Sequence, residues 1–122
     1  MRTVGILGGM GPEATVALMT RVLALVDASG DADHVPLLVD QNTQVPSRIA
    51  HLIEGTGPSP ESDLRAMAKR LEAAGATALA MACNTAHHFA PAIRDAVSIP
   101  FLDIVDLSLA RVPPGPVGIV GS

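Results

Sequence analysis

The fold of this chain follows from residues 80–88, with the sequence AMACNTAHH, where an apolar run gives way to a helical pattern. The run from Ala78 to Ala82 has the length and composition of a buried strand. Cys83 comes directly after it, and the helical pattern begins near Asn84. The segment therefore predicts a parallel strand that leads at once into a helix, the place where open α/β sheets put their ligand sites.

Strand and helix patterns alternate on both sides of this segment. The expected strands span residues 4–7, 35–39, 77–82, 99–102 and 117–120, and the expected helices span residues 14–26, 47–53, 62–74, 84–97 and 104–111. Strict alternation of this kind predicts an open parallel α/β sheet of the Rossmann or flavodoxin type, with right-handed crossovers and helices on both faces.

Two of the expected helices carry a defined inward face. The helix over residues 14–26 is expected to direct Val16, Met19, Leu23 and Val26 to one side, and the helix that ends near Ala74 is expected to bury Leu64, Met67, Ala68 and Leu71. In the helix over residues 84–97, Pro91 either marks the true first turn or produces a kink.

Composition excludes several classes of protein. The chain has 122 residues, 48% of them hydrophobic and 16% charged, which is typical of a globular domain with an aliphatic core. A net charge of −4 argues against nucleic-acid binding, which requires a clustered basic face. No signal peptide and no run long enough for a membrane span are expected. One unpaired cysteine fits a reducing, cytoplasmic compartment.

A glycine loop follows the first expected strand. Gly9-x-Gly11-x-x-Ala14 formally matches a dinucleotide fingerprint, and Asp40 ends the second strand, where a ribose-binding acid belongs. The loop is equally compatible with a glycine turn that only allows a helix to pack closely. A nucleotide-binding α/β module therefore remains an alternative at this point.

Polar side chains also follow the second and third strands. Arg48 can grip a carboxylate through two N–H groups, although a solvated surface arginine is the ordinary interpretation. A Cys/His metal site is poorly supported, because His34 and His51 lack ligand spacing. Cys83 itself is either a buried structural thiol or a nucleophile with His87 or His88 as its base. A histidine four or five positions along the same helix need not reach the thiol.

Three blocks together resemble the aspartate/glutamate racemase family, and most of all its aspartate racemase branch. They are residues 6–12 (ILGGMGP) with Ala14 and Thr15, residues 42–46 (NTQVP) with Arg48, and residues 83–87 (CNTAH) after the third strand. The similarity runs through the whole chain in order. The resemblance implies a cofactor-independent amino-acid racemase in which two cysteines act on opposite sides of the substrate Cα.

The resemblance also implies roles for individual residues. Cys83 is the expected acid/base, and Asn84 and Thr85 are expected to hold the α-carboxylate. The remaining expected substrate contacts are Gly9, Met10, Asn42, Gln44 and Arg48, with Arg48 on the side-chain carboxylate of a dicarboxylic substrate such as aspartate. His87 is expected to play a supporting role, and His88 is unassigned.

Family members are nearly twice as long as this chain and carry the second cysteine in a second, similar domain. We therefore expect residues 1–112 to form the first domain, and residues 113–122 to be a linker and the first strand of the second. No cofactor or metal is expected, and the resemblance suggests a homodimer. A one-cysteine isomerase or decarboxylase of the same superfamily and a catalytically silent fragment are the remaining alternatives.

Overall fold

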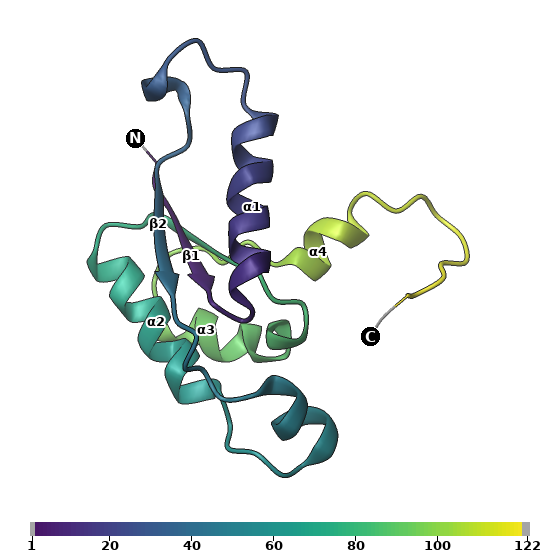
Figure 1. The fold of residues 1–122 in the computed structure, drawn as a ribbon. Helices are drawn as coiled ribbons and strands as arrows, with labels where there is room; N and C mark the ends of the chain where they lie inside the picture. Colours follow the sequence, from purple (N-terminus) through teal and green to yellow (C-terminus); the bar gives the residue numbers. More distant parts are fainter. Residues whose placement is uncertain (1, 121–122) are drawn as a thin grey trace.

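A three-stranded parallel sheet forms the centre of the computed structural model, which describes residues 2–120. The strands are β1 (Val4–Gly8), β2 (Leu37–Gln41) and β3 (Ala78–Met81), in the order β2-β1-β3. Val4 lies opposite Leu37 on one side and Ala78 on the other. Because all three strands are parallel, their carboxyl ends meet at one edge of the sheet (Figure 1).

Helices lie on both faces of the sheet, as the alternating pattern predicts (Figure 1). The α-helices are α1 (Pro12–Leu25), α2 (Glu61–Ala73), α3 (Ala90–Ala96) and α4 (Ile104–Leu109). Three shorter turns complete the chain: 3-10 helices η1 (Asp31–Asp33) and η3 (Thr85–Phe89), and a π-helical turn η2 (Ala50–Glu54).

Two glycines of β1 set how closely the helices approach the sheet. A Cβ atom on Gly5 would come within 2.9 Å of the Leu79 side chain and within 3.1 Å of Leu71 on α2. A Cβ atom on Gly8, on the opposite face, would come within 2.5 Å of Thr15 on α1. The glycine-rich strand therefore allows both layers to pack directly on its backbone.

The hydrophobic core lies between the sheet and the α2–α3 face. The four residues of α2 expected to point inward, Leu64, Met67, Ala68 and Leu71, are all buried. They pack with Leu7 and Leu79 from the sheet and with Phe89, Ile93 and Phe101 from the following segments. Gly75 ends this helix with a positive φ of 107°, a conformation that glycine adopts without strain.

The inward face expected for α1 is wrong. Val16 and Leu23 are 57% and 54% exposed, whereas Thr15 is buried and Leu18 and Val22 face the sheet side. Apolar residues occur on more than one side of this helix, so its periodicity does not define one stripe. The close contact between Gly8 and Thr15 fixes the rotation of the helix instead.

Other boundaries differ from the sequence expectation for identifiable reasons. The segment over residues 84–97 divides into η3 and α3, and Pro91 occupies the first turn of α3, where no N–H is needed. Residues 99–102 form only one parallel bridge, between Phe101 and Leu79, because Pro100 has no N–H to extend the ladder. The short helix expected over residues 47–53 contains the π-turn η2, and β2 is shifted by two residues.

The strand expected over residues 117–120 is absent from the described part of the chain. These residues follow a segment with Pro113, Pro114 and Pro116, leave the body of the molecule and are exposed (Figure 1). The division into a first domain over residues 1–112 and a linker into a second domain stays a prediction, and residues 121 and 122 lie outside the described range.

Candidate active site

A cavity of about 450 Å³ opens at the carboxyl ends of β1 and β3. It is the place predicted for a ligand site, because the loops that follow parallel strands converge there. Four of the residues predicted to form the site lie together in its wall. The lining residues are Met10, Ala14, Leu18, Met81, Ala82, Cys83, Asn84, Thr85 and Ile104.

Cys83 is the only ionisable side chain among these lining residues. It is a free, half-buried cysteine that packs against the edge of the core. It follows β3 after one residue, and the turn η3 begins two residues later at Thr85. Cys83 therefore lies between a strand end and a helix start. One side of the cavity wall is apolar and is formed by Leu18, Met81 and Ile104.

The glycine loop after β1 holds Met10 in the cavity wall. The Gly9 N–H donates to the buried Thr15 Oγ1 at 3.0 Å. Gly9 has a φ of 94°, and a Cβ atom there would lie 2.3 Å from the Asn42 carbonyl oxygen. The Asn42 N–H in turn donates to the Gly8 carbonyl at 3.1 Å, so the loops after β1 and β2 are joined.

The polar residues of the loop after β2 serve the loop itself. Asn42 Oδ1 accepts a hydrogen bond from the Gln44 N–H at 3.0 Å. Arg48 donates from Nη1 to the carbonyls of Val45 and Pro46 at 3.3 and 3.2 Å. Asn42, Gln44 and Arg48 are not among the lining residues of the Cys83 cavity, and their substrate contacts stay predictions.

Asp40 is engaged by an ion pair. Arg70 of α2 donates to the same Asp40 carboxylate oxygen from Nε at 3.1 Å and from Nη2 at 2.7 Å. A ribose-binding acid needs a carboxylate that can accept from the ribose hydroxyls. This pair ties the carboxylate to a structural partner and weakens the case for a nucleotide site.

His87 is buried and does not have a ring nitrogen free to serve as a base for Cys83. Its Nδ1 lies 2.6 Å from the Cys83 carbonyl oxygen, and its Nε2 lies 3.2 Å from the Ile104 backbone nitrogen. The ring also stacks on Phe101 with centroids 5.5 Å apart. The interpretation of His87 as a general base for a nucleophilic thiol is therefore unsupported, and its supporting role stays a prediction.

Sequence reasoning missed one side of the cavity. Ile104 begins α4 and lines the cavity, although no role was expected for the segment that follows residues 99–102. The available signal was Asp103, a helix N-cap residue placed directly after an apolar run. Its carboxylate accepts hydrogen bonds from the N–H groups of Val105 and Asp106 at 2.8 and 3.3 Å.

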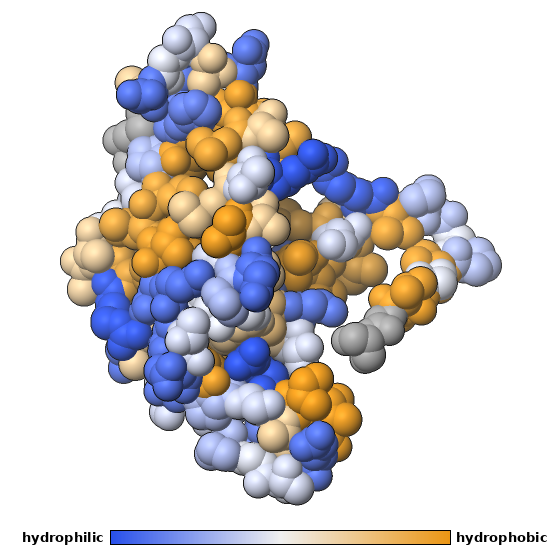
Figure 2. All heavy atoms as spheres, viewed as in Figure 1, coloured by the Kyte–Doolittle hydropathy of each residue, from blue (hydrophilic) through white to orange (hydrophobic). Residues whose placement is uncertain are grey.

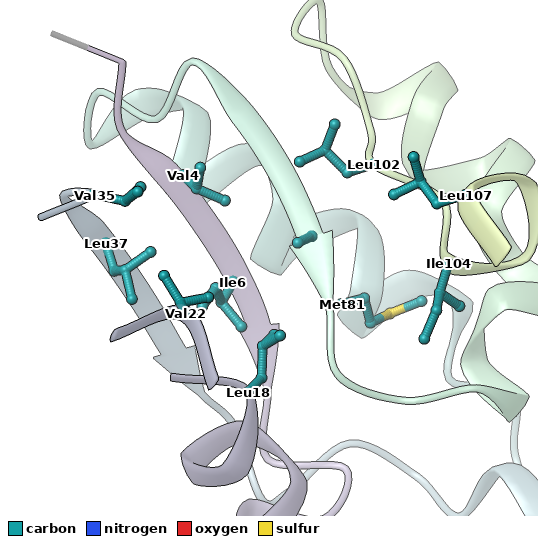
Figure 3. Close-up of a pocket in the computed structure, with 11 residues that line it drawn as sticks. Val4, Ile6, Leu18, Val22, Val35, Leu37, Met81, Leu102, Ile104 and Leu107 are labelled. Atoms are coloured by element: carbon teal, nitrogen blue, oxygen red, sulfur yellow. The ribbon is translucent and has the colours of Figure 1, made fainter. Parts of the chain in front are cut away.

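A second hollow, the apolar groove, lies beside the cavity between α1, the sheet and α4 (Figure 3). It encloses about 350 Å³ and shares Leu18, Met81 and Ile104 with the Cys83 cavity. Its other lining residues are Val4, Ile6, Val22, Val35, Leu37, Ala80, Leu102 and Leu107. All of these side chains are apolar, so the groove offers no acid, base or nucleophile.

Within residues 2–120, no three side chains of His, Cys, Asp or Glu converge in a way that could hold a metal ion. No helix in the same range is long and apolar enough to cross a membrane.

Comparison with known proteins identifies relatives of one kind. The Asp/Glu/hydantoin racemase family matches residues 7–122. The broad specificity amino-acid racemase RacX of Bacillus subtilis (strain 168) is 29% identical over 123 residues, which cover 90% of this chain and 49% of the relative.

Solved structures agree with this result. An aspartate racemase from Picrophilus torridus superposes with a TM-score of 0.83 at 34% identity, over 90% of this chain and 46% of that one. An aspartate racemase homologue from Pyrococcus horikoshii OT3 gives a TM-score of 0.72 at 27% identity, over 87% and 46%. The chain thus spans about half the length of the relatives that it matches.

Proposed function

Because the chain belongs to the Asp/Glu/hydantoin racemase family, we propose that it supplies the Cys83 side of a cofactor-independent amino-acid racemase. The proposed substrate is an acidic amino acid, aspartate in the first place. The observation that carries the proposal is the position of Cys83 in a cavity wall formed by the loops at the carboxyl ends of β1 and β3.

The proposed reaction begins with removal of the α-proton of the amino acid by the Cys83 thiolate. The electron pair of the broken C–H bond then delocalises into the α-carboxylate, which must be stabilised by donors aimed at the developing charge. Leu18, Met81 and Ile104 give this cavity a partly apolar wall, and charge–dipole contacts are stronger beside apolar surface than in bulk water.

Asn84 and Thr85 are proposed to bind the α-carboxylate, since both line the cavity next to the thiol. Arg48 is proposed to bind the side-chain carboxylate. Its Nη1 is engaged by two backbone carbonyls, but a guanidinium carries five N–H donors in all, so donors remain for a ligand. Asn42 and Gln44 are proposed to add polar contacts from the same loop, and Gly9 to position Met10.

Inversion at Cα needs an acid on the face opposite Cys83. The sequence contains one cysteine, so a second thiol has to come from outside these 122 residues. We propose that it comes from the part of the family protein that this chain does not span. The activity proposed here is therefore that of the family-length protein.

The test is exchange of the α-hydrogen of L- and D-aspartate in D₂O, measured by NMR and chiral chromatography. The family-length protein and its Cys83→Ser variant are compared, with His88→Asn as a surface control. Exchange with racemisation that is lost in Cys83→Ser supports the proposal. Absence of exchange from folded protein with either enantiomer overturns the aspartate assignment.

A one-cysteine isomerase or decarboxylase is the second candidate, because a site with Cys83 as its one active cysteine would suit those reactions. The same experiment separates the two. Exchange of one enantiomer without racemisation means that Cys83 acts as a lone base. Release of carbon dioxide identifies a decarboxylase.

The assembly and location follow the same family argument. We propose a homodimer, as the family resemblance suggests. We also propose a cytoplasmic location, because the single free thiol suits a reducing compartment. The proposed partner is a small dicarboxylic amino acid. The net charge of −4 speaks against a nucleic-acid partner.

A further inference from the structure

We propose that His87 is a positioning residue that joins two walls of the Cys83 cavity through a neutral imidazole with its proton on Nδ1. One wall is the turn that carries Cys83, and the other is the start of α4 at Ile104. The proposal rests on the proposed function only in naming this cavity as the reaction site.

The two hydrogen bonds of the ring fix its chemical form. A backbone carbonyl can only accept, so the 2.6 Å contact with the Cys83 oxygen requires an N–H on Nδ1. A backbone N–H can only donate, so the 3.2 Å contact with Ile104 requires a bare lone pair on Nε2. The neutral Nδ1–H tautomer alone satisfies both bonds, because an imidazolium would direct an N–H at the N–H of Ile104.

The two partners of the ring belong to the same cavity. Cys83 and Ile104 both line it, although they are far apart along the chain. His87 is 7% exposed and its ring stacks on Phe101, so the side chain is held in place by packing as well as by hydrogen bonds. One side chain therefore sets the separation between the thiol-bearing turn and the opposite wall.

The second wall depends on this connection because α4 is otherwise weakly held. The helix has six residues, and none of them is buried. Apart from His87, its start is held by the Asp103 cap and by Arg94. The Arg94 guanidinium lies 3.4 Å from both Asp103 and Asp106.

Arg94 also lies 5.6 Å from the centroid of the Phe101 ring, on which His87 stacks. Through these contacts the His87 ring is linked to Cys83 on its own turn, and to Arg94 with its partners Asp103 and Asp106. His88, next in sequence, is exposed, and the centroid of its ring lies 5.1 Å from the centroid of the Phe89 ring.

The first test reads the tautomer directly in the unmodified 122-residue chain. Long-range ¹H–¹⁵N NMR of the labelled protein at neutral pH distinguishes Nδ1–H, Nε2–H and imidazolium. The expected result is Nδ1–H for His87. An Nε2–H tautomer or an imidazolium overturns the proposal without any variant being made.

The second test separates the two bonds with substitutions. His87→Asn places an amide N–H near Nδ1 and keeps the bond to Cys83, whereas His87→Phe keeps the stacked ring and loses both bonds. Amide hydrogen exchange of Ile104 should become roughly tenfold faster in both variants, the scale of one lost hydrogen bond. His88→Asn is the matched control and should leave that rate unchanged.

Alkylation of Cys83 by iodoacetamide reports the other wall. The rate should stay within about twofold of wild type in His87→Asn and change by roughly tenfold in His87→Phe, again the scale of one hydrogen bond. Equal rates in the two variants, or an unchanged Ile104 amide, overturn the proposal. None of these readouts needs turnover, so a negative result here leaves the aspartate exchange experiment intact, and the reverse also holds.

Discussion

At the scale of single residues, Gly8 controls how closely α1 (Pro12–Leu25) approaches the sheet. A Cβ atom at this position would lie 2.5 Å from Thr15 Oγ1 and 2.7 Å from Thr15 Cγ2, which is closer than packed atoms allow. We expect Gly8→Ala to lower the free energy of unfolding by about 1–3 kcal/mol, the usual cost of overpacking. Urea titration measures the loss.

Gly30→Ala is the matched control for this substitution. Nothing lies within 4 Å of its added Cβ atom, and its φ of −158° is accessible to alanine. The control should be neutral to within about 0.5 kcal/mol. Equal stability of Gly8→Ala and Gly30→Ala would show that α1 does not pack against Gly8 as described.

Glu72 gives the fold a pH dependence at its surface. The side-chain hydroxyl and the backbone N–H of Ser98 both donate to its carboxylate, and they lower the pKa of Glu72 below its ordinary value of 4.5. A depressed folded-state pKa stabilises the protein above the unfolded-state pKa, and this stabilisation is lost as the pH falls through the folded-state value. Wild type should therefore be more stable than Glu72→Gln at neutral pH.

The measurement is the urea midpoint of both proteins at about pH 7 and about pH 3, on either side of the ordinary carboxyl range. The difference between them should shrink at the acidic pH, where Glu72 takes up its proton. A difference that is the same at both pH values contradicts the role given to the ionised carboxylate.

At the scale of elements, the start of α4 (Ile104–Leu109) depends on Asp103. The carboxylate accepts hydrogen bonds from Val105 and Asp106 and lies 3.4 Å from Arg94. Asp103→Ala should cost about 1 kcal/mol, as for other lost N-caps, and should speed amide exchange at Val105 and Asp106. Asp95→Ala, which removes a pair between Arg65 and a largely exposed carboxylate, should have little effect.

The elements also show how much of the fold the sequence predicts. The α2 helix (Glu61–Ala73) was predictable with its inward face, because Leu64, Met67, Ala68 and Leu71 form one stripe on a polar helix. The rotation of α1 was not predictable, since Val16, Leu18, Val22 and Leu23 point to several sides. It depends on the contact between Gly8 and Thr15, which joins two elements and leaves no periodic signal.

The residues of the candidate site likewise divide into those that were predictable and those that were not. Cys83 was predictable from the strand-to-helix junction, whereas Met10, Asn84 and Thr85 were expected from the family resemblance, and the four residues meet in one cavity. The place of Ile104 in the cavity was not predictable, because it depends on the hydrogen bond from the Ile104 N–H to His87 Nε2, which joins residues far apart in the sequence. Aliphatic side chains that line a cavity also resemble ordinary core residues in a sequence.

At the scale of the whole molecule, the apolar groove between α1 and α4 is open to solvent. Figure 2 shows apolar side chains gathered over both helices on this side of the molecule. Leu107 lines the groove and is 54% exposed, whereas Ile53, which is 72% exposed, does not line it. Contiguous apolar surface of this kind is unusual in an isolated domain.

The groove should bind the dye 8-anilinonaphthalene-1-sulfonate, which fluoresces on apolar surface. We expect Leu107→Glu to reduce the fluorescence of the 122-residue chain several-fold, because it places a carboxylate in the groove. Ile53→Glu is the matched control and should leave most of the signal. Equal reductions in the two variants would place the dye elsewhere.

The position of β1 (Val4–Gly8) in the middle of the sheet also bears on how the chain folds during its synthesis. β1 leaves the ribosome first, but its second partner is not made until Ala78, to which Val4 pairs. At about 5–20 residues per second, the first strand waits about 4–15 s for that partner. Throughout this interval Ile6 and Leu7, later among the most buried residues, lack one flank of the sheet. Chaperone demand during translation should therefore be highest before Ala78 is made, and the turn with Cys83 is assembled only after that point.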